Sequence, residues 1–147
     1  MKTEFPLEPP LDFLQHLWEL NHALEQRSLQ MERTMGVTAQ QRLALRCIGH
    51  HPGLTASQLA GVLHLDRGTV SVSLRRLTDK GLVTARRDEK DSRRMALALT
   101  ARGAKLNRPD PRTVEHVVEQ LLGAASAREV ANTKQVLRRL SQGLRTL

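Results

Sequence analysis

The 147-residue sequence contains very few aromatic side chains, because it has no tyrosine, two phenylalanines and one tryptophan. Its single cysteine, Cys47, excludes an internal disulfide framework and fits a reducing cytoplasm. No apolar run is long enough to span a membrane, and the first ten residues, MKTEFPLEPP, lack the apolar core of a signal peptide. These absences predict a cytoplasmic protein. A chain of 147 residues is long enough to bury a core that needs neither metal nor disulfide to fold. The prolines Pro6, Pro9 and Pro10 predict a loose N-terminal arm.

The sequence also lacks the motifs on which most catalytic sites are built. It has no glycine-rich phosphate loop and no nucleophile elbow. Six histidines are present, but the last helices carry only His116 and therefore no His-x-x-His or His-x-x-x-His pair. We expect no enzymatic activity, no bound metal and no other cofactor.

The net charge of +8 is unevenly distributed along the chain. Residues 67–105 carry eleven lysines and arginines against four acidic residues, a net +7, so the rest of the chain is nearly neutral. Such a local excess implies a polyanionic partner, with nucleic acid as the first candidate. An anionic membrane surface would favour aromatic or leucine side chains on a basic amphipathic face, and residues 67–105 contain no aromatic residue. The charge pattern therefore favours DNA and argues against a membrane.

Apolar periodicity and capping residues predict a mainly α-helical chain with one small β-hairpin. Residues 11–35 predict a long helix, since Leu17, Leu24 and Met31 follow seven-residue spacing. Residues 82–86 and 95–100 predict the two strands of the hairpin. A short helix is expected over residues 101–106, and five more are expected after the capping residues Thr38, Thr55, Asp66, Asp110 and Ser126.

Three helices followed by a two-stranded ribbon, over residues 37–100, form the element order of a winged helix-turn-helix. In that architecture the second helix of the turn enters the major groove of DNA, and the hairpin wing reaches the backbone or the minor groove. The flanking helices, in residues 11–36 and 101–147, are too apolar to stand alone in water and predict a dimerisation platform. The whole of residues 1–147 is then one domain.

The wing tip is the most highly charged stretch of the sequence. From Arg86 to Arg94, eight of nine residues are charged, five of them basic. A run of this kind is often only a solvated turn. A guanidinium group on a hairpin tip, however, suits a narrow groove of strong negative potential, and its basic neighbours suit phosphates.

Several short motifs occur in the order and at the spacing found in one known family. They are Pro52-Gly53-Leu54-Thr55, Leu59-Ala60, Thr69-Val70-Ser71, Lys80-Gly81-Leu82-Val83, and the set Asp88, Asp91, Arg93, Leu97, Leu99, Thr100 and Gly103. With these motifs, residues 37–105 resemble the MarR family of bacterial transcriptional regulators.

The resemblance implies a homodimer that binds double-stranded DNA sequence-specifically, typically as a repressor on a pseudo-palindromic operator. In the family, the arginine at the place of Arg93 inserts into the minor groove, and the aspartate at the place of Asp91 shapes the wing tip. Many members release DNA when a small aromatic or phenolic effector binds between the dimer helices and the DNA-binding lobe. For this chain the resemblance places that pocket near Trp18, His22 and Arg46, although for Trp18 packing in the core or the dimer interface is favoured.

The residues that we expect to contact DNA come from the second helix of the turn and from the wing. Two of them depart from the family pattern: Val72 stands where an arginine is usual, and Arg75 where an acidic residue is common. Val72 could pack on a thymine methyl and Arg75 could read guanine, so the operator should differ from the commonest one. The expected contacts are Arg67, Thr69, Ser71, Val72, Arg75, Arg76, Arg86, Arg87, Lys90, Arg93 and Arg94.

Three alternatives stay open at the level of sequence. Cys47 could be a redox-sensing thiol, but redox-sensing relatives place theirs in the first helix beside tyrosines, so a core position is favoured. An architectural DNA-binding protein would share the basic surface but show little sequence preference. A protein-interaction module that kept only the fold would not bind DNA.

The break at Pro109–Pro111 is a further departure from the family pattern. It indicates that the hinge between the two lobes differs from that of the family.

Overall fold

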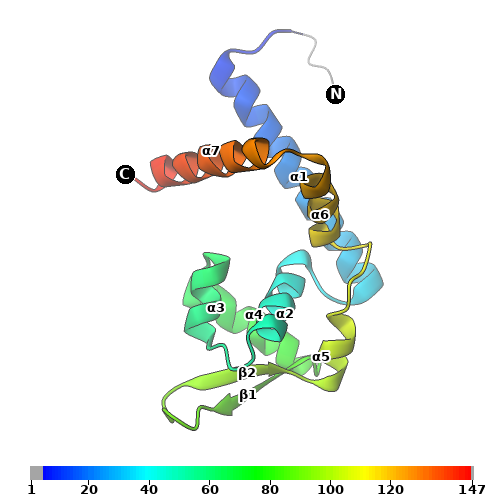
Figure 1. Cartoon of the computed structure of the whole chain (residues 1–147), viewed down its shortest axis with the longest axis vertical. Helices are drawn as coiled ribbons and strands as arrows, with labels where there is room; N and C mark the ends of the chain where they lie inside the picture. The colour runs from blue at the N-terminus through cyan, green and yellow to red at the C-terminus, as the bar shows by residue number, and fades with distance from the viewer. Residues whose placement is uncertain (1–4, 147) are drawn as a thin grey trace. The chain divides into compact units, whose positions relative to one another are not determined.

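The computed structural model describes residues 5–146, which form a mainly helical protein with one two-stranded antiparallel sheet (Figure 1). The chain divides into two compact units, the first ending at Pro109 and the second beginning at Asp110. After the long first helix, three helices precede the hairpin and a short helix follows it, which confirms the expected winged-helix order. The elements are α1 (Pro9–Met35), α2 (Ala39–His50), α3 (Ala56–Leu63), α4 (Arg67–Asp79), β1 (Val83–Arg87), β2 (Met95–Leu99), α5 (Ala101–Leu106), α6 (Val114–Ala124) and α7 (Ala127–Arg145).

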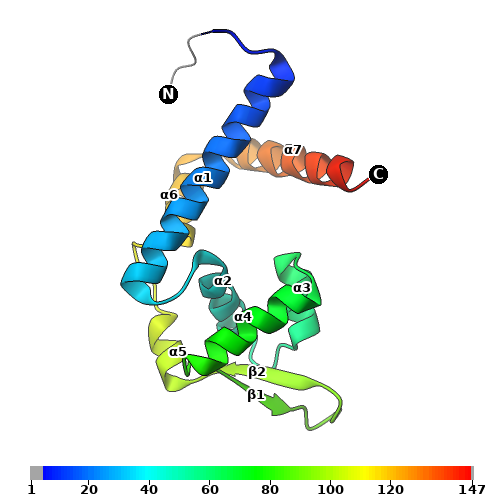
Figure 2. The ribbon, with the colours of Figure 1, turned by 180° about the vertical axis from the view of Figure 1, so that it is seen from behind.

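The core of the first unit lies between α2, α3, α4 and the hairpin. It is aliphatic, as the scarcity of aromatic residues requires, and burial of such side chains provides the main driving force for folding. Figure 2 shows α4 lying along this assembly with the hairpin beneath it. The core residues are Val37, Ala44, Leu45, Ile48, Leu59, Ala60, Val70, Leu77, Leu82, Val83 and Leu97.

The predicted helix starts are confirmed at four of five positions. Capping boxes occur at Thr38, Thr55 and Ser126. In each box the hydroxyl of the cap residue accepts the backbone N–H of the residue three positions later. The side chain of that later residue, a Gln or a Glu, accepts the backbone N–H of the cap residue. Asp66 caps α4 through its carboxylate. Each cap satisfies backbone donors that the first turn of a helix leaves unpaired.

Two expectations about proline-containing segments were wrong. Pro9 and Pro10 do not lie in a loose arm but form the first residues of α1, because proline lacks the N–H that a first turn leaves unused. Asp110 does not cap α6: Thr113 does, accepting the N–H of His116 at 3.3 Å. The Asp110 carboxylate is instead occupied by the backbone N–H of Arg112 at 2.9 Å and by its guanidinium at 2.6 Å.

The hairpin pairs Val83 with Leu99 and Arg87 with Met95 at its two ends. Its second strand also receives the segment before α3, because the Leu97 N–H donates to the carbonyl of Leu54 at 2.8 Å. α5 follows β2 directly, and the Thr100 hydroxyl donates to the Gly81 carbonyl at 2.6 Å. The wing is thus anchored at its base on both sides, and only its tip extends from the lobe.

The helices outside the lobe keep much of their apolar surface exposed. α6 and α7 contain no buried residue, and α1 buries only Met31. Amphipathic helices with uncovered apolar faces require a partner surface. Among the described residues, none of the helices is both long and apolar enough for a transmembrane span. Exposed apolar residues include Leu20, Leu24 and Leu29 on α1, Val117, Val118, Leu121 and Leu122 on α6, and Val136, Leu137 and Leu144 on α7.

Candidate DNA-binding surface

α4 begins with a cap that engages one of the expected DNA contacts. The Asp66 carboxylate accepts the backbone N–H and the hydroxyl of Thr69, each at 2.8 Å. These hydrogen bonds hold the pKa of the Asp66 carboxyl below its ordinary value, because they stabilise the ionised form. The Thr69 hydroxyl proton therefore serves the helix start.

The outer face of α4 is fully available to a partner. Val70 and Leu77 point into the core, while Ser71, Val72 and Arg75 are exposed. Residues three and four apart lie on one face of a helix, so Ser71, Val72 and Arg75 form a short stripe. The major groove of DNA is wide enough to admit such a helix, and this stripe would then face the base edges.

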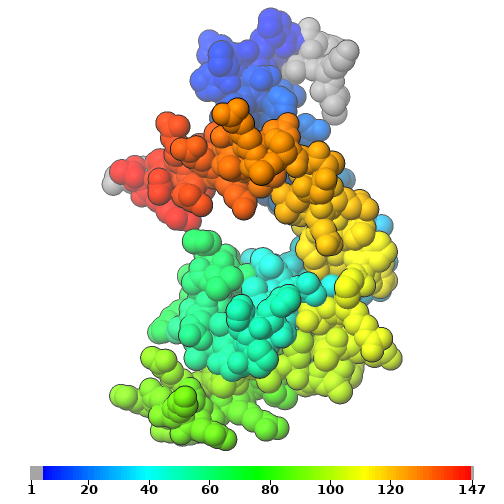
Figure 3. Space-filling view, viewed as in Figure 1, coloured from blue at the N-terminus to red at the C-terminus, as the bar shows by residue number. Residues whose placement is uncertain are grey.

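Two carboxylates organise the wing tip, and that of Asp88 accepts the backbone N–H of Lys90 at 2.9 Å. Asp91 Oδ1 accepts the backbone N–H of Arg93 at 3.1 Å and its Nε–H at 3.3 Å, and Asp91 Oδ2 lies 3.7 Å from Nε of Arg94. The tip is closed by the Arg94 N–H, which donates to the Asp91 carbonyl at 3.0 Å. The Arg93 side chain is still 91% exposed. The backbone of the tip is thus held in place while the Arg93 guanidinium stays open to solvent. Figure 3 shows the hairpin, in yellow-green, projecting at the edge of the first unit.

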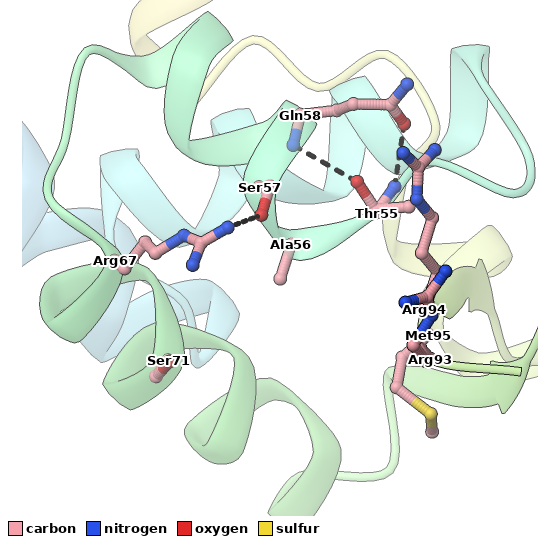
Figure 4. A pocket seen from close by; sticks show the side chains of 9 residues that line it. All are labelled: Thr55, Ala56, Ser57, Gln58, Arg67, Ser71, Arg93, Arg94 and Met95. Carbon is pink, nitrogen blue, oxygen red and sulfur yellow. Dashed lines mark hydrogen bonds between the residues drawn. The ribbon is translucent and has the colours of Figure 1, made fainter. Parts of the chain in front are cut away.

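A basic groove of about 650 Å³ joins the start of α3, the start of α4 and the wing (Figure 4). Arg67 donates to the Ser57 hydroxyl on one side, and Arg93 and Arg94 border the other side. None of the residues that line the groove is acidic. The complete lining is Thr55, Ala56, Ser57, Gln58, Arg67, Ser71, Arg93, Arg94 and Met95.

Sequence reasoning missed the contribution of α3 to this groove. The sequence marks Thr55 only as a capping residue, which indicates where a helix begins but not what it faces. A helix N-terminus carries a partial positive charge and unpaired N–H groups, so its presence beside Arg67 adds to the anion-attracting character of the groove. The signal that could have found it is the position of α3 as first helix of the turn, immediately before the recognition helix.

Lys80 belongs to the basic segment of residues 67–105, but its side chain is bound within the first unit. The Lys80 ammonium group donates to the Gly36 carbonyl at 2.6 Å and to Gln41 Oε1 at 3.2 Å. These bonds tie the end of α4 to the turn between α1 and α2. Lys80 therefore serves the internal organisation of the first unit.

The three residues expected at an effector pocket lie in different surroundings. Trp18 is 64% exposed on α1 and His22 is also exposed, whereas Arg46 on α2 donates to the Asn107 carbonyl at 3.1 Å. A small groove at Arg46 also includes Cys47 but neither Trp18 nor His22. Burial raises the pKa of the Cys47 thiol and so lowers its reactivity. Within residues 5–146, no three His, Cys, Asp or Glu side chains form a metal-binding group.

Comparison with known proteins identifies the family. Residues 35–94 match the sequence model of the MarR family. The transcriptional regulator HosA of Escherichia coli O127:H6 is 30% identical over 104 residues, which cover 71% of this chain and 77% of HosA. The chain belongs to the MarR family.

Other MarR-type proteins are similar over shorter or longer stretches. The organic hydroperoxide resistance transcriptional regulator of Bacillus subtilis is 38% identical over 72 residues, so the match spans about half (49%) of either chain. The structure of the S. aureus MepR–DNA complex superposes with a TM-score of 0.74 at 25% identity, covering 90% of this chain and 98% of MepR. The resemblance noted in the sequence and the winged-helix fold are thereby confirmed.

Proposed function

We propose that this MarR-family protein is a homodimeric, sequence-specific regulator that represses transcription from a pseudo-palindromic operator in double-stranded DNA. The observation that carries the proposal is the continuity of the basic surface. The exposed face of α4, the groove at the start of α3 and the presented Arg93 all belong to one unit, and the groove has no acidic lining residue. The similarity to MepR, whose structure was determined as a DNA complex, supports this reading.

Within this proposal each part of the surface has its own task. Ser71, Val72, Arg75 and Arg76 on α4 would face the major groove, where base edges carry a distinct pattern of donors and acceptors. Arg93 would enter the minor groove. The groove shared by α3 and the wing would hold backbone phosphates, with Arg67 and Arg94 supplying charge and the remaining wing cations, Arg86, Arg87 and Lys90, steering the approach.

Dimerisation is supported by the uncovered apolar faces of α1, α6 and α7. Burying such faces against a second copy removes apolar surface from water, which is favourable at about 25 cal/mol per Å². A two-fold dimer presents two identical lobes, and this symmetry is what a pseudo-palindromic operator reads. A small aromatic or phenolic effector that releases DNA stays part of the proposal, with Trp18, His22 and Arg46 as the residues to test.

The test is fluorescence anisotropy with the duplex upstream of the protein's own gene, compared with a scrambled duplex at several salt concentrations. We expect a preference of about a thousandfold for the native duplex at physiological salt. Equal and steeply salt-dependent binding to both duplexes would favour an architectural protein instead. Lack of binding to either would favour the protein-interaction module.

Substitution of Arg75 tests base reading by α4. Since a bidentate contact to guanine is worth about 1–3 kcal/mol of discrimination, Arg75→Ala should reduce the preference for the native duplex by about tenfold or more per half-site. Affinity for the scrambled duplex should change little. Arg139→Ala, which removes an exposed arginine of α7, is the matched control. An equal loss of affinity for native and scrambled duplexes would show that Arg75 contacts only phosphate.

A further inference from the structure

Two arginines of α2 hold the end of α5. Arg42 donates through Nη1 to the carbonyl of Leu106 and through Nη2 to that of Arg108 at 2.7 Å. Arg46, one helical turn later, donates through Nη1 to the carbonyl of Asn107 at 3.1 Å. Three consecutive carbonyls are therefore bound by two side chains from one face of another helix. We call this arrangement, Arg42 and Arg46 with the carbonyls of residues 106–108, the arginine clasp.

The chemistry of the clasp suits its place in the fold. The last carbonyls of a helix have no partner within the helix, and the C-terminal end carries a partial negative charge that favours cations. The planar guanidinium of Arg42 offers two parallel N–H donors, which a lysine cannot reproduce. Arg42 is fully buried, at 0% exposure, and a buried cation is costly unless it is well hydrogen-bonded. The clasp therefore depends on specific contacts that a generic positive charge would not supply.

Close packing next to the clasp shows that this contact is built into the fold. A Cβ at Gly49 of α2 would overlap the side-chain amide of Asn107 and would lie 3.1 Å from Leu99 Cδ1. Any larger residue at this position would require the Asn107 side chain to move. The start of α5 is equally fixed, because the Thr100 N–H donates to the Leu82 carbonyl at 3.0 Å. α5 is thus held at both ends and is a rigid part of the DNA-binding lobe up to Arg108.

The clasp ends where the first compact unit ends. The next residue, Pro109, closes the first unit, and the second begins at Asp110 with its own local order, the carboxylate bound by Arg112. Pro109 and Pro111 have restricted φ angles. The clasp therefore holds the last residues of the lobe, immediately before these prolines.

We propose that Arg42 and Arg46 are positioning residues for DNA recognition: the clasp fixes the exit of the chain from the lobe and thereby the half-site spacing that the dimer accepts. The inference rests on the proposed homodimeric function, because spacing matters only when two lobes read two half-sites. It assigns a role in DNA binding to two arginines that do not lie on the basic surface. Arg46, which the sequence placed in an effector pocket, acts here through the backbone of α5.

The first test uses the free protein and hydrogen exchange followed by mass spectrometry. In the Arg46→Met variant, amides of residues 101–108, including that of Asn107, which donates to the Gly103 carbonyl, should exchange about tenfold faster. Exchange in residues 67–95 should not change. Arg108→Met is the matched control, because it removes an exposed side chain but leaves the carbonyl that Arg42 binds. Unchanged exchange in Arg46→Met would overturn the clasp.

The second test measures affinity for operator duplexes whose half-site separation is native, shortened by one base pair, or lengthened by one or two. The unsubstituted protein and Arg108→Met should discriminate strongly between these duplexes. Arg46→Met should lose about tenfold of that discrimination while keeping its affinity for an isolated half-site. Arg46 is the residue of choice because replacing the fully buried Arg42 can prevent folding.

The outcomes separate this inference from the proposed function. If the unsubstituted protein binds all sequences equally, the proposed function is wrong, and so is the role of the clasp in half-site spacing. Hydrogen exchange would still show whether the clasp itself exists. If that protein binds its operator specifically but Arg46→Met retains the full spacing preference, only the positioning role is overturned. An equal loss of affinity for every duplex, isolated half-sites included, would likewise overturn it.

Discussion

Replacing Gly103 with alanine should destabilise the protein by about 3 kcal/mol and lower its melting temperature by about 6 to 12 °C. A Cβ at this position would overlap the carbonyl oxygen of Leu82 and lie 3.0 Å from its carbonyl carbon. Both obstacles are backbone atoms at the start of the hairpin, so no side-chain rotation can relieve them. The Leu82 carbonyl also accepts the N–H of Thr100, and α5 cannot move away without losing that bond. Thermal or urea unfolding monitored by circular dichroism measures the effect.

Gly61→Ala is the matched control for this prediction. Gly61 lies in α3, and a Cβ there would meet no atom within 4 Å. Alanine in a helix interior is about 0.5–1 kcal/mol more favourable than glycine, so this variant should be slightly more stable than the original. Equal stability of the Gly103 and Gly61 variants would show that α5 is not packed tightly on the hairpin.

The features that the sequence predicts correctly are those whose causes are local. The boxes at Thr38, Thr55 and Ser126 need only four consecutive residues to form. Val70 and Leu77, the two buried residues of α4, lie seven residues apart, which is about two turns of a helix. Because these local signals occur in the order of a winged helix-turn-helix, they are sufficient to predict the fold class.

The features that the sequence could not predict depend on contacts between distant segments. Asp110 is a residue type that often caps helices, but its carboxylate binds Arg112 instead. The sequence does not show whether Asp110 or Thr113 forms the cap of lower free energy. In the sequence, Lys80 is indistinguishable from the other cations of the basic segment of residues 67–105. Only the structure shows that it binds the Gly36 carbonyl, 44 residues away. Arg42 and Arg46 bind carbonyls more than 60 residues further on. Charge alone did not distinguish cations that face a partner from cations that hold the fold.

Arg93→Ala should give the largest loss of DNA affinity among single substitutions on the basic surface. A charge-assisted contact is worth about 1.5–3 kcal/mol, so about tenfold is expected per lobe and about a hundredfold for a dimer that uses both. The slope of log affinity against log salt should fall by about two, because two cations no longer displace counterions. Fold stability should not change, since the side chain is 91% exposed and its ion pair with Asp91 is worth little in water. Anisotropy titrations across salt concentrations measure both quantities.

Arg128→Ala controls for the loss of one exposed positive charge per chain, because Arg128 lies on α7, outside the basic surface. If both variants bind with the same affinity and the same salt slope, the wing takes no part in recognition and the charged tip is a solvated turn. If DNA affinity falls only in Arg93→Ala, the hydrogen bonds of Asp91 have a role in DNA recognition. The Arg93 side chain contributes almost nothing to stability, but Asp91 holds its backbone in place. This fixed backbone limits the conformational entropy that Arg93 loses on entering the minor groove.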